Sequence, residues 1–137
     1  MKKTRVLFLC TNNSARSQMA EGLLRVLGGD RFEVESAGHM PTQVHPLAIQ
    51  AMAEIGIDIS HHRAKNVAEF LGQTFDVVVT LCGDDAPGSC PFFPGGKKYM
   101  HVPFPDPATG DLEKFRRVRD ALRAWIEETF LKGENHA

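Results

Sequence analysis

The chain has 137 residues, enough for one domain that buries a hydrophobic core. Hydrophobic residues make up 42% and charged residues 24%, as in ordinary globular proteins, and a formal net charge of −1 argues against nucleic acid as a partner. No apolar run approaches the roughly 20 residues of a membrane-spanning helix. The apolar stretch before Cys10 is too short for a signal peptide, so we expect a cytoplasmic protein with no membrane partner. Its small size and balanced charge favour a monomer.

Strand-like and helix-like segments alternate along the chain. Four segments have the apolar patterns of strands, at residues 6–9, 32–36, 75–80 and 99–102. Four others have helical periodicity or helix-boundary residues, at 14–27, 46–55, 66–71 and 111–131. The stretch 83–98, with four Gly and three Pro, predicts a loop at least in part. This order predicts one α/β domain over residues 1–137: a three-layer α/β/α arrangement around a four-stranded parallel sheet, with 133–137 as a frayed tail.

The most informative residues follow the first predicted strand, which ends at Cys10. They form a C-x₅-R-S pattern before a helix: Thr11, Asn12, Asn13, Ser14, Ala15, Arg16 and Ser17. Backbone N–H groups at a helix start bind oxyanions, and an arginine can grip two oxygens of a tetrahedral oxyanion. The same field stabilises a cysteine thiolate, to which Ser17 can donate a hydrogen bond. The alternative is a turn with an incidental thiol, but the flanking strand and helix favour an oxyanion site with Cys10 as nucleophile.

A carboxyl group is expected at the same edge of the sheet. Asp106 follows the last predicted strand and precedes Pro107. A carboxylic acid there can protonate the oxygen that leaves the oxyanion centre. Asp106-Pro107 could instead only turn the chain, but its pairing with Cys10 favours the general acid.

The segment from Cys10 to Ser17 together with Asp106-Pro107 resembles the low-molecular-weight protein tyrosine phosphatase family, over nearly the whole chain. That resemblance implies a nucleophilic Cys10, an oxyanion-binding Arg16 and an acidic Asp106. A finer likeness is to the thioredoxin-coupled arsenate reductases on this fold. It is carried by residues 13–22, 56–60 and 79–82, by Cys90, and by Ala108-Thr109-Gly110, where the phosphatases usually carry aromatic residues.

The finer likeness implies a thiol cascade. Cys10 attacks arsenate, Cys82 attacks Cys10 as arsenite leaves, and Cys90 attacks Cys82, which leaves a disulfide for thioredoxin to reduce. No metal or tightly bound cofactor is implied, and phosphate or sulfate are expected as competing oxyanions. A low-molecular-weight thiol with a glutaredoxin-type partner is the alternative electron donor. The alternative for Cys82 and Cys90 is two unrelated thiols beside a loop.

The chain departs from the family pattern at four places. Ala15 stands where some relatives carry a further cysteine, which the cascade does not need. Asn12 stands where the family often has Gly, although Asn also tolerates a left-handed conformation. Cys82 and Cys90 are one residue further apart than in similar reductases. Some relatives bind potassium with residues matching Asn13, Glu21, Ser36 and an acid at position 65. Here position 65 is Lys65, and we hypothesise that its ammonium replaces the cation and pairs with Glu21; the alternative is a solvated surface lysine.

Six histidines complete the candidates. Their spacing predicts no metal site, and we interpret them as surface or capping residues: His39, His45, His61, His62, His101 and His136.

Three functions remain open at this point. The first is arsenate reduction. The second is hydrolysis of phosphotyrosine or small phosphomonoesters, because Cys10, Arg16 and Asp106 serve either tetrahedral oxyanion. The third is a non-enzymatic oxyanion-binding module, which an unreactive Cys10 would favour.

Overall fold

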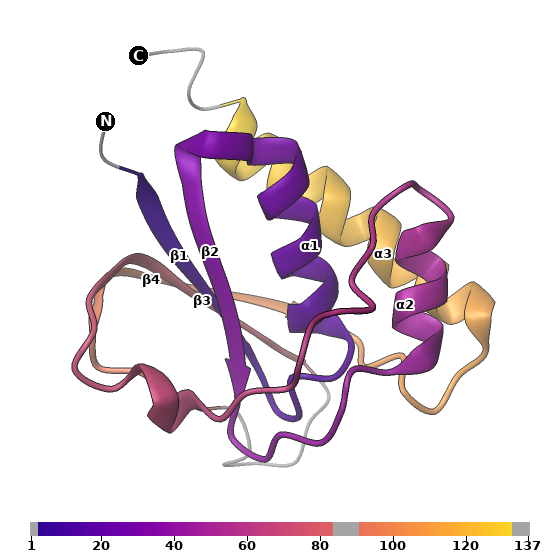
Figure 1. Ribbon diagram of the computed structural model, residues 1–137, viewed down its shortest axis with the longest axis horizontal. Helices are drawn as coiled ribbons and strands as arrows, with labels where there is room; N and C mark the ends of the chain where they lie inside the picture. Colours follow the sequence, from indigo (N-terminus) through magenta and orange to yellow (C-terminus); the bar gives the residue numbers. More distant parts are fainter. Residues whose placement is uncertain (1–2, 84–90, 133–137) are drawn as a thin grey trace.

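A parallel sheet forms the centre of the computed structural model, which describes residues 3–83 and 91–132. Its strand order is β2-β1-β3-β4. The strands are β1 (Thr4–Cys10), β2 (Phe32–Gly38), β3 (Phe75–Cys82) and β4 (Gly96–Phe104) (Figure 1). The predicted α/β class and four-stranded parallel sheet are confirmed.

β4 begins earlier than predicted, at Gly96 rather than Tyr99. The first residues of β4 lack the apolar pattern by which strands are predicted. β4 is an edge strand, and Lys97 and Lys98 are exposed on it. Charged residues are common on edge strands, where they discourage pairing with other chains.

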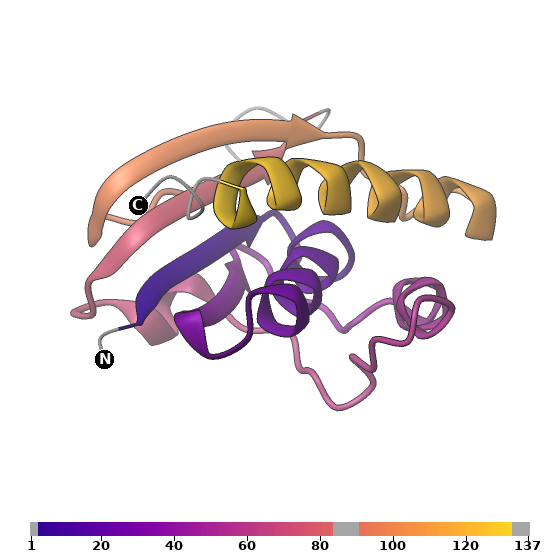
Figure 2. The same cartoon turned by 90° about the horizontal axis from the view of Figure 1, so that it is seen from above.

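Two helices cover one face of the sheet, α1 (Arg16–Gly28) and α3 (Leu112–Ile126), and α2 (Pro46–Ala53) packs against these helices, away from the strands (Figure 2). α3 runs on as a π-helical segment, Glu127–Leu131. Strands and helices share a core on this face, with contributions from Val6, Phe8, Val79, Leu81, Met19, Leu23, Met52, Phe115 and Leu122. α2 is also tied to α3 through Glu54, whose pKa the hydrogen-bonded Arg116, with help from Arg119, holds at about 2.

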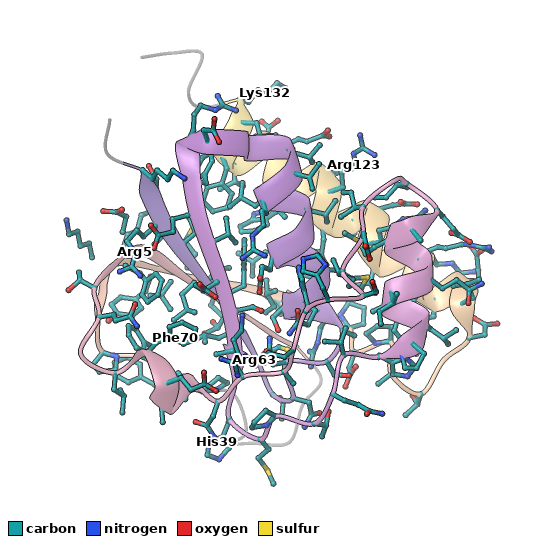
Figure 3. The ribbon with its side chains drawn as sticks, viewed as in Figure 1. Arg5, His39, Arg63, Phe70, Arg123 and Lys132 are labelled. Atoms are coloured by element: carbon teal, nitrogen blue, oxygen red, sulfur yellow. The ribbon has the colours of Figure 1, made fainter. Side chains whose placement is uncertain are left out.

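The opposite face has a thinner cover than the sequence predicts. Leu7 and Leu9 pack there against Phe70 and Phe93. Phe70 comes from η2 (Val67–Phe70), a single 3-10 turn where a helix over 66–71 was expected (Figure 3). The turn is capped by the Asn66 side chain and is followed by Gly72 at φ 90°, a left-handed conformation that cannot continue a helix.

The topology places a crevice at the carboxyl end of β1. β1 lies between β2 and β3. After β1 the chain adds β2 on one side of it and later adds β3 on the other side. Ligands of parallel sheets bind at such switch points. Over residues 3–83 and 91–132, no helix has the length and apolar character needed to cross a membrane.

Candidate active site

A cavity of about 190 Å³ opens at this crevice. Its walls come from the end of β1, the start of α1, the segment before α2 and the loop after β4; they comprise Cys10, Asn12, Ser14, Ala15, Arg16, Thr42, His45, Asp106 and Ala108. Cys10, Arg16 and Asp106, far apart in sequence, therefore meet at one cavity. Of the predicted cradle, Thr11, Asn13 and Ser17 do not line it.

The loop between β1 and α1 is held by the segment that follows β2. Met40 N–H donates to Thr11 O at 2.9 Å, Thr42 N–H to Asn12 O at 3.2 Å, and His45 N–H to Ser14 O at 3.0 Å. Since N–H and C=O of a trans peptide point in opposite directions, the N–H groups that follow these carbonyls point away from the 39–45 segment. α1 begins at Arg16, later than the predicted Ser14, because residues 11–15 form this loop.

Among the described residues of the loop, the left-handed one is Asn13, with φ 50°, and Asn12 does not need the tolerance for this conformation that its residue type offers. Asn adopts this conformation more readily than most residues. Gly38, at the end of β2, makes the loop possible in a second way. A Cβ on Gly38 would lie 2.7 Å from both Asn13 N and Thr11 O, so only glycine allows this approach.

The Asn13 side chain organises the hydrogen bonds beneath Cys10. Its Oδ1 accepts from the Lys65 backbone N–H at 2.8 Å, which fixes its Nδ2 as the donor. Nδ2 then donates to Ser17 Oγ at 2.7 Å and to Ser36 Oγ at 2.9 Å. Because Ser17 Oγ accepts from Asn13, its own proton is free for Cys10 Sγ, 2.9 Å away. A donor aimed at sulfur favours the thiolate.

The second branch of this network ends on a buried carboxylate. Ser36 Oγ donates to Glu21 Oε1 at 2.5 Å. Glu21 has 3% of its side chain exposed and also faces two cations, Arg25 Nη2 at 2.7 Å and Lys65 Nζ at 3.3 Å. Lys65 is buried as well, and its Nζ lies 3.1 Å from Glu35 Oε1. Lys65 is thus not the solvated surface lysine of the alternative interpretation.

His62 belongs to the same buried cluster, which corrects its interpretation as a surface or capping residue. Its side chain is 4% exposed, and Nδ1 lies 2.9 Å from Gln18 Oε1 and 3.9 Å from Glu21 Oε2. Burial lowers the pKa of His62 below its ordinary value of 6.5, against the attraction of Glu21. A neutral ring with its proton on Nδ1 can donate to Gln18, whose Nε2 in turn donates to Asn13 O.

Arg16 is held by the ends of two strands. Its Nη1 donates to Phe104 O at 3.2 Å and to Leu81 O at 3.5 Å, and the residue is 2% exposed. Its Nη2 lies 3.7 Å from Asp106 Oδ2. Asp106 Oδ1 accepts from Ala108 N–H at 3.0 Å, so Asp106 turns the chain and also lines the cavity.

Cys82 ends β3, beside the loop. The register pairs Leu9 with Thr80, so Cys10 and Cys82 lie near the ends of neighbouring strands, which are about 4.8 Å apart. Thr11, which does not line the cavity, places its Oγ1 3.9 Å from Cys82 Sγ. Cys90 lies outside the described residues, as does the rest of the segment 84–90 in the predicted loop after Cys82.

Sequence reasoning missed three residues of this site. Gly38 needs the three-dimensional approach of two segments, and Thr42 lies in an irregular segment without a pattern. His45 had a usable signal: it precedes Pro46 at a helix start, after a strand whose carboxyl end faces the same edge. In the described part of the chain, no group of three or more His, Cys, Asp and Glu side chains is placed to hold a metal ion.

Comparisons with known proteins identify a family with the same kind of site. Residues 5–132 match the model of the low molecular weight phosphotyrosine protein phosphatase family, and the chain belongs to this family. Within it, the chain is similar to arsenate reductase 1 of Staphylococcus epidermidis, at 46% identity over 127 residues, 93% of this chain and 96% of that protein. The predicted resemblance is therefore confirmed.

Solved structures agree. An arsenate reductase in the phosphate-binding state superposes with a TM-score of 0.81 at 36% identity, covering 94% of this chain and 98% of that one. A thioredoxin-dependent arsenate reductase from Corynebacterium glutamicum has a TM-score of 0.69 at 27% identity, covering 95% of this chain and 63% of that one.

Proposed function

We propose that this protein reduces arsenate to arsenite, with Cys10 as nucleophile and a cascade through Cys82 and Cys90. The observation that carries the proposal is the position of Cys82. It ends the strand next to Cys10 and contacts Thr11 of the oxyanion loop, where a phosphatase needs no second thiol. The similarity to arsenate reductases supports the same choice.

In the first step the Cys10 thiolate attacks arsenic and displaces one oxygen. Arg16 and the N–H groups of residues 11–17 hold the remaining oxygens. Asp106 donates a proton to the departing oxygen, which leaves as water. The product is a Cys10 sulfur–arsenic bond, with arsenic still in its oxidised state. Phosphate and sulfate, which have the same shape, compete for the cradle.

In the second step the Cys82 thiolate attacks Cys10 Sγ. The sulfur–arsenic bond breaks, its electron pair leaves with arsenic as arsenite, and a Cys10–Cys82 disulfide forms. Cys90 then attacks Cys82, which returns Cys10 as a thiolate and transfers the disulfide to Cys82 and Cys90. A dithiol protein of the thioredoxin type reduces this disulfide, as the similarity to a thioredoxin-dependent reductase suggests.

The Lys65 ammonium supplies the positive charge that Glu21 requires beneath the loop. Lys65 Nζ lies between Glu21 and Glu35, at 3.3 and 3.1 Å. A cation at this place fixes Glu21, which accepts from Ser36. Asn13 then donates to Ser36 and to Ser17, and this leaves the Ser17 proton for the Cys10 sulfur. We therefore expect turnover that does not depend on potassium.

Hydrolysis of phosphomonoesters is the second candidate, because the family is named for it and Cys10, Arg16 and Asp106 suffice for it. Among the residues that the structure describes, however, no Phe, Tyr or Trp lines the cavity to grip an aryl group.

One assay separates the two candidates: NADPH oxidation with thioredoxin, thioredoxin reductase and arsenate. The proposal predicts turnover in wild type and none in Cys10→Ser, Cys82→Ser or Cys90→Ser. Aryl phosphate hydrolysis that needs only Cys10, with no arsenate-dependent oxidation, would instead assign a phosphatase.

A further inference from the structure

His45 is held at the cavity wall in one orientation. Its backbone N–H donates to Ser14 O at 3.0 Å, and its ring packs on Phe115 with centroids 4.6 Å apart. Its Nδ1 accepts from Leu47 N–H at 3.1 Å, as the cap of α2. These three contacts, one from the backbone and two from the ring, join the oxyanion loop, α3 and α2 at a single residue.

The cap also fixes the proton on the ring. A nitrogen that accepts a backbone N–H carries no hydrogen of its own, so a neutral His45 is protonated at Nε2. His45 lines the cavity with Cys10, Arg16 and Asp106. In the structure, His45 Nε2 has no hydrogen-bond partner among residues 3–83 and 91–132.

We propose that the Nε2–H of His45 donates a hydrogen bond to an oxygen of the anion bound over Cys10, and so acts as an oxyanion-positioning residue. The inference rests on the oxyanion site of the proposed function and adds a donor that the loop does not contain. A neutral donor with a fixed proton would bind without changing its own charge. It would reach the anion from the residue that caps α2.

Two substitutions of His45 separate its role as a hydrogen-bond donor through Nε2 from its role as the cap of α2 through Nδ1. In His45→Asn, the side-chain oxygen can replace Nδ1 as the cap acceptor, since Asn is a favourable cap, but no donor reaches the place of Nε2. In His45→Gln, the amide N–H reaches the place of Nε2, but Gln caps poorly. Asn66→Ser is the matched control, because Asn66 caps η2 in the same way and does not line the cavity.

The assay measures anion binding without turnover. In a Cys82→Ser/Cys90→Ser background, iodoacetamide alkylates Cys10, and inorganic phosphate protects it. The inference predicts that His45→Asn raises the half-protecting phosphate concentration about tenfold, the size expected for one hydrogen bond to a charged group. His45→Gln should stay within about threefold of the parent, with a lower Tm, and Asn66→Ser should bind phosphate as the parent does.

The reverse pattern, with His45→Asn binding as the parent and His45→Gln weakened, would overturn the inference and leave His45 as a cap. Equal weakening of both variants would also overturn it. Phosphate that fails to protect the parent refutes the oxyanion site together with this inference. By contrast, intact protection in a protein that does not reduce arsenate would refute only the proposed reaction.

Discussion

Replacing Lys65 with methionine tests the buried charge cluster beneath the active site. Met keeps most of the apolar stem and removes the ammonium that faces Glu21 at 3.3 Å and Glu35 at 3.1 Å. The two partners differ in environment, because the Glu21 side chain is 3% exposed and the Glu35 side chain 33%. Most of the cost therefore comes from Glu21, which would remain buried with one fewer cation.

Removing one partner of a buried ion pair costs about 3–5 kcal/mol. Glu21 keeps Arg25 at 2.7 Å and the Ser36 hydroxyl, so we expect a smaller loss of unfolding free energy than this range, about 2–3 kcal/mol. Adding Glu21→Gln to Lys65→Met removes the uncompensated charge and should recover more than half of this loss. Lys97→Met is the control, because the Lys97–Asp76 pair spans 3.5 Å with Lys97 61% exposed, and should change stability by less than about 0.5 kcal/mol.

Urea unfolding of these variants gives the free energies, and turnover with matched potassium and sodium chloride gives the role of the cation. Wild type should respond equally to both salts, whereas Lys65→Asp, which replaces the ammonium with a carboxylate beside Glu21, should turn over faster with potassium. A Lys65→Met protein as stable as wild type would refute the reasoning about Glu21. Potassium-stimulated turnover of wild type would refute the claim that the ammonium replaces a cation.

Three further predictions concern the loop and its support. Ser17→Ala removes the donor 2.9 Å from sulfur and should slow alkylation of Cys10 by iodoacetamide at pH 7 by about tenfold, and an unchanged rate would contradict the proton order deduced for the network. Gly38→Ala places a Cβ 2.7 Å from loop backbone, so arsenate turnover should fall at least about a hundredfold with a lowered Tm, and near-normal turnover would show that the loop can move aside. Because burial lowers the pKa of His62, the unfolded chain binds its proton first, and stability should fall as the pH drops below about 6.5; His62→Asn should show a weaker dependence in urea melts from pH 7.5 to 5.

The meeting of Cys10, Arg16 and Asp106 at one cavity could be predicted because the position of each follows directly from local sequence. A short apolar run ends at Cys10, a helix starts soon after, and Asp106 follows another strand, so the topology of parallel sheets brings them to one edge. The fold class followed from the same alternation. The early start of β4 did not, because an edge strand can carry Lys97 and Lys98 without an apolar pattern.

The support beneath the loop depends on contacts between segments far apart in the chain. The left-handed turn falls at Asn13 rather than Asn12 because the Asn13 side chain has partners on β2 and beside Lys65. His62 is buried since it packs against α1, which no local pattern around it indicates. Gly38 is required only because the loop passes over the end of β2.

The central claim is that Cys10 and Cys82 exchange a sulfur–arsenic bond for a disulfide, and a single turnover of Cys90→Ser tests it most directly. The variant is reduced, freed of thiol and mixed with arsenate in the absence of thioredoxin, and its mass and released arsenite are measured. The account predicts one arsenite per chain and a Cys10–Cys82 disulfide in the peptide map. Arsenate that remains unreduced while both cysteines stay alkylatable would contradict it.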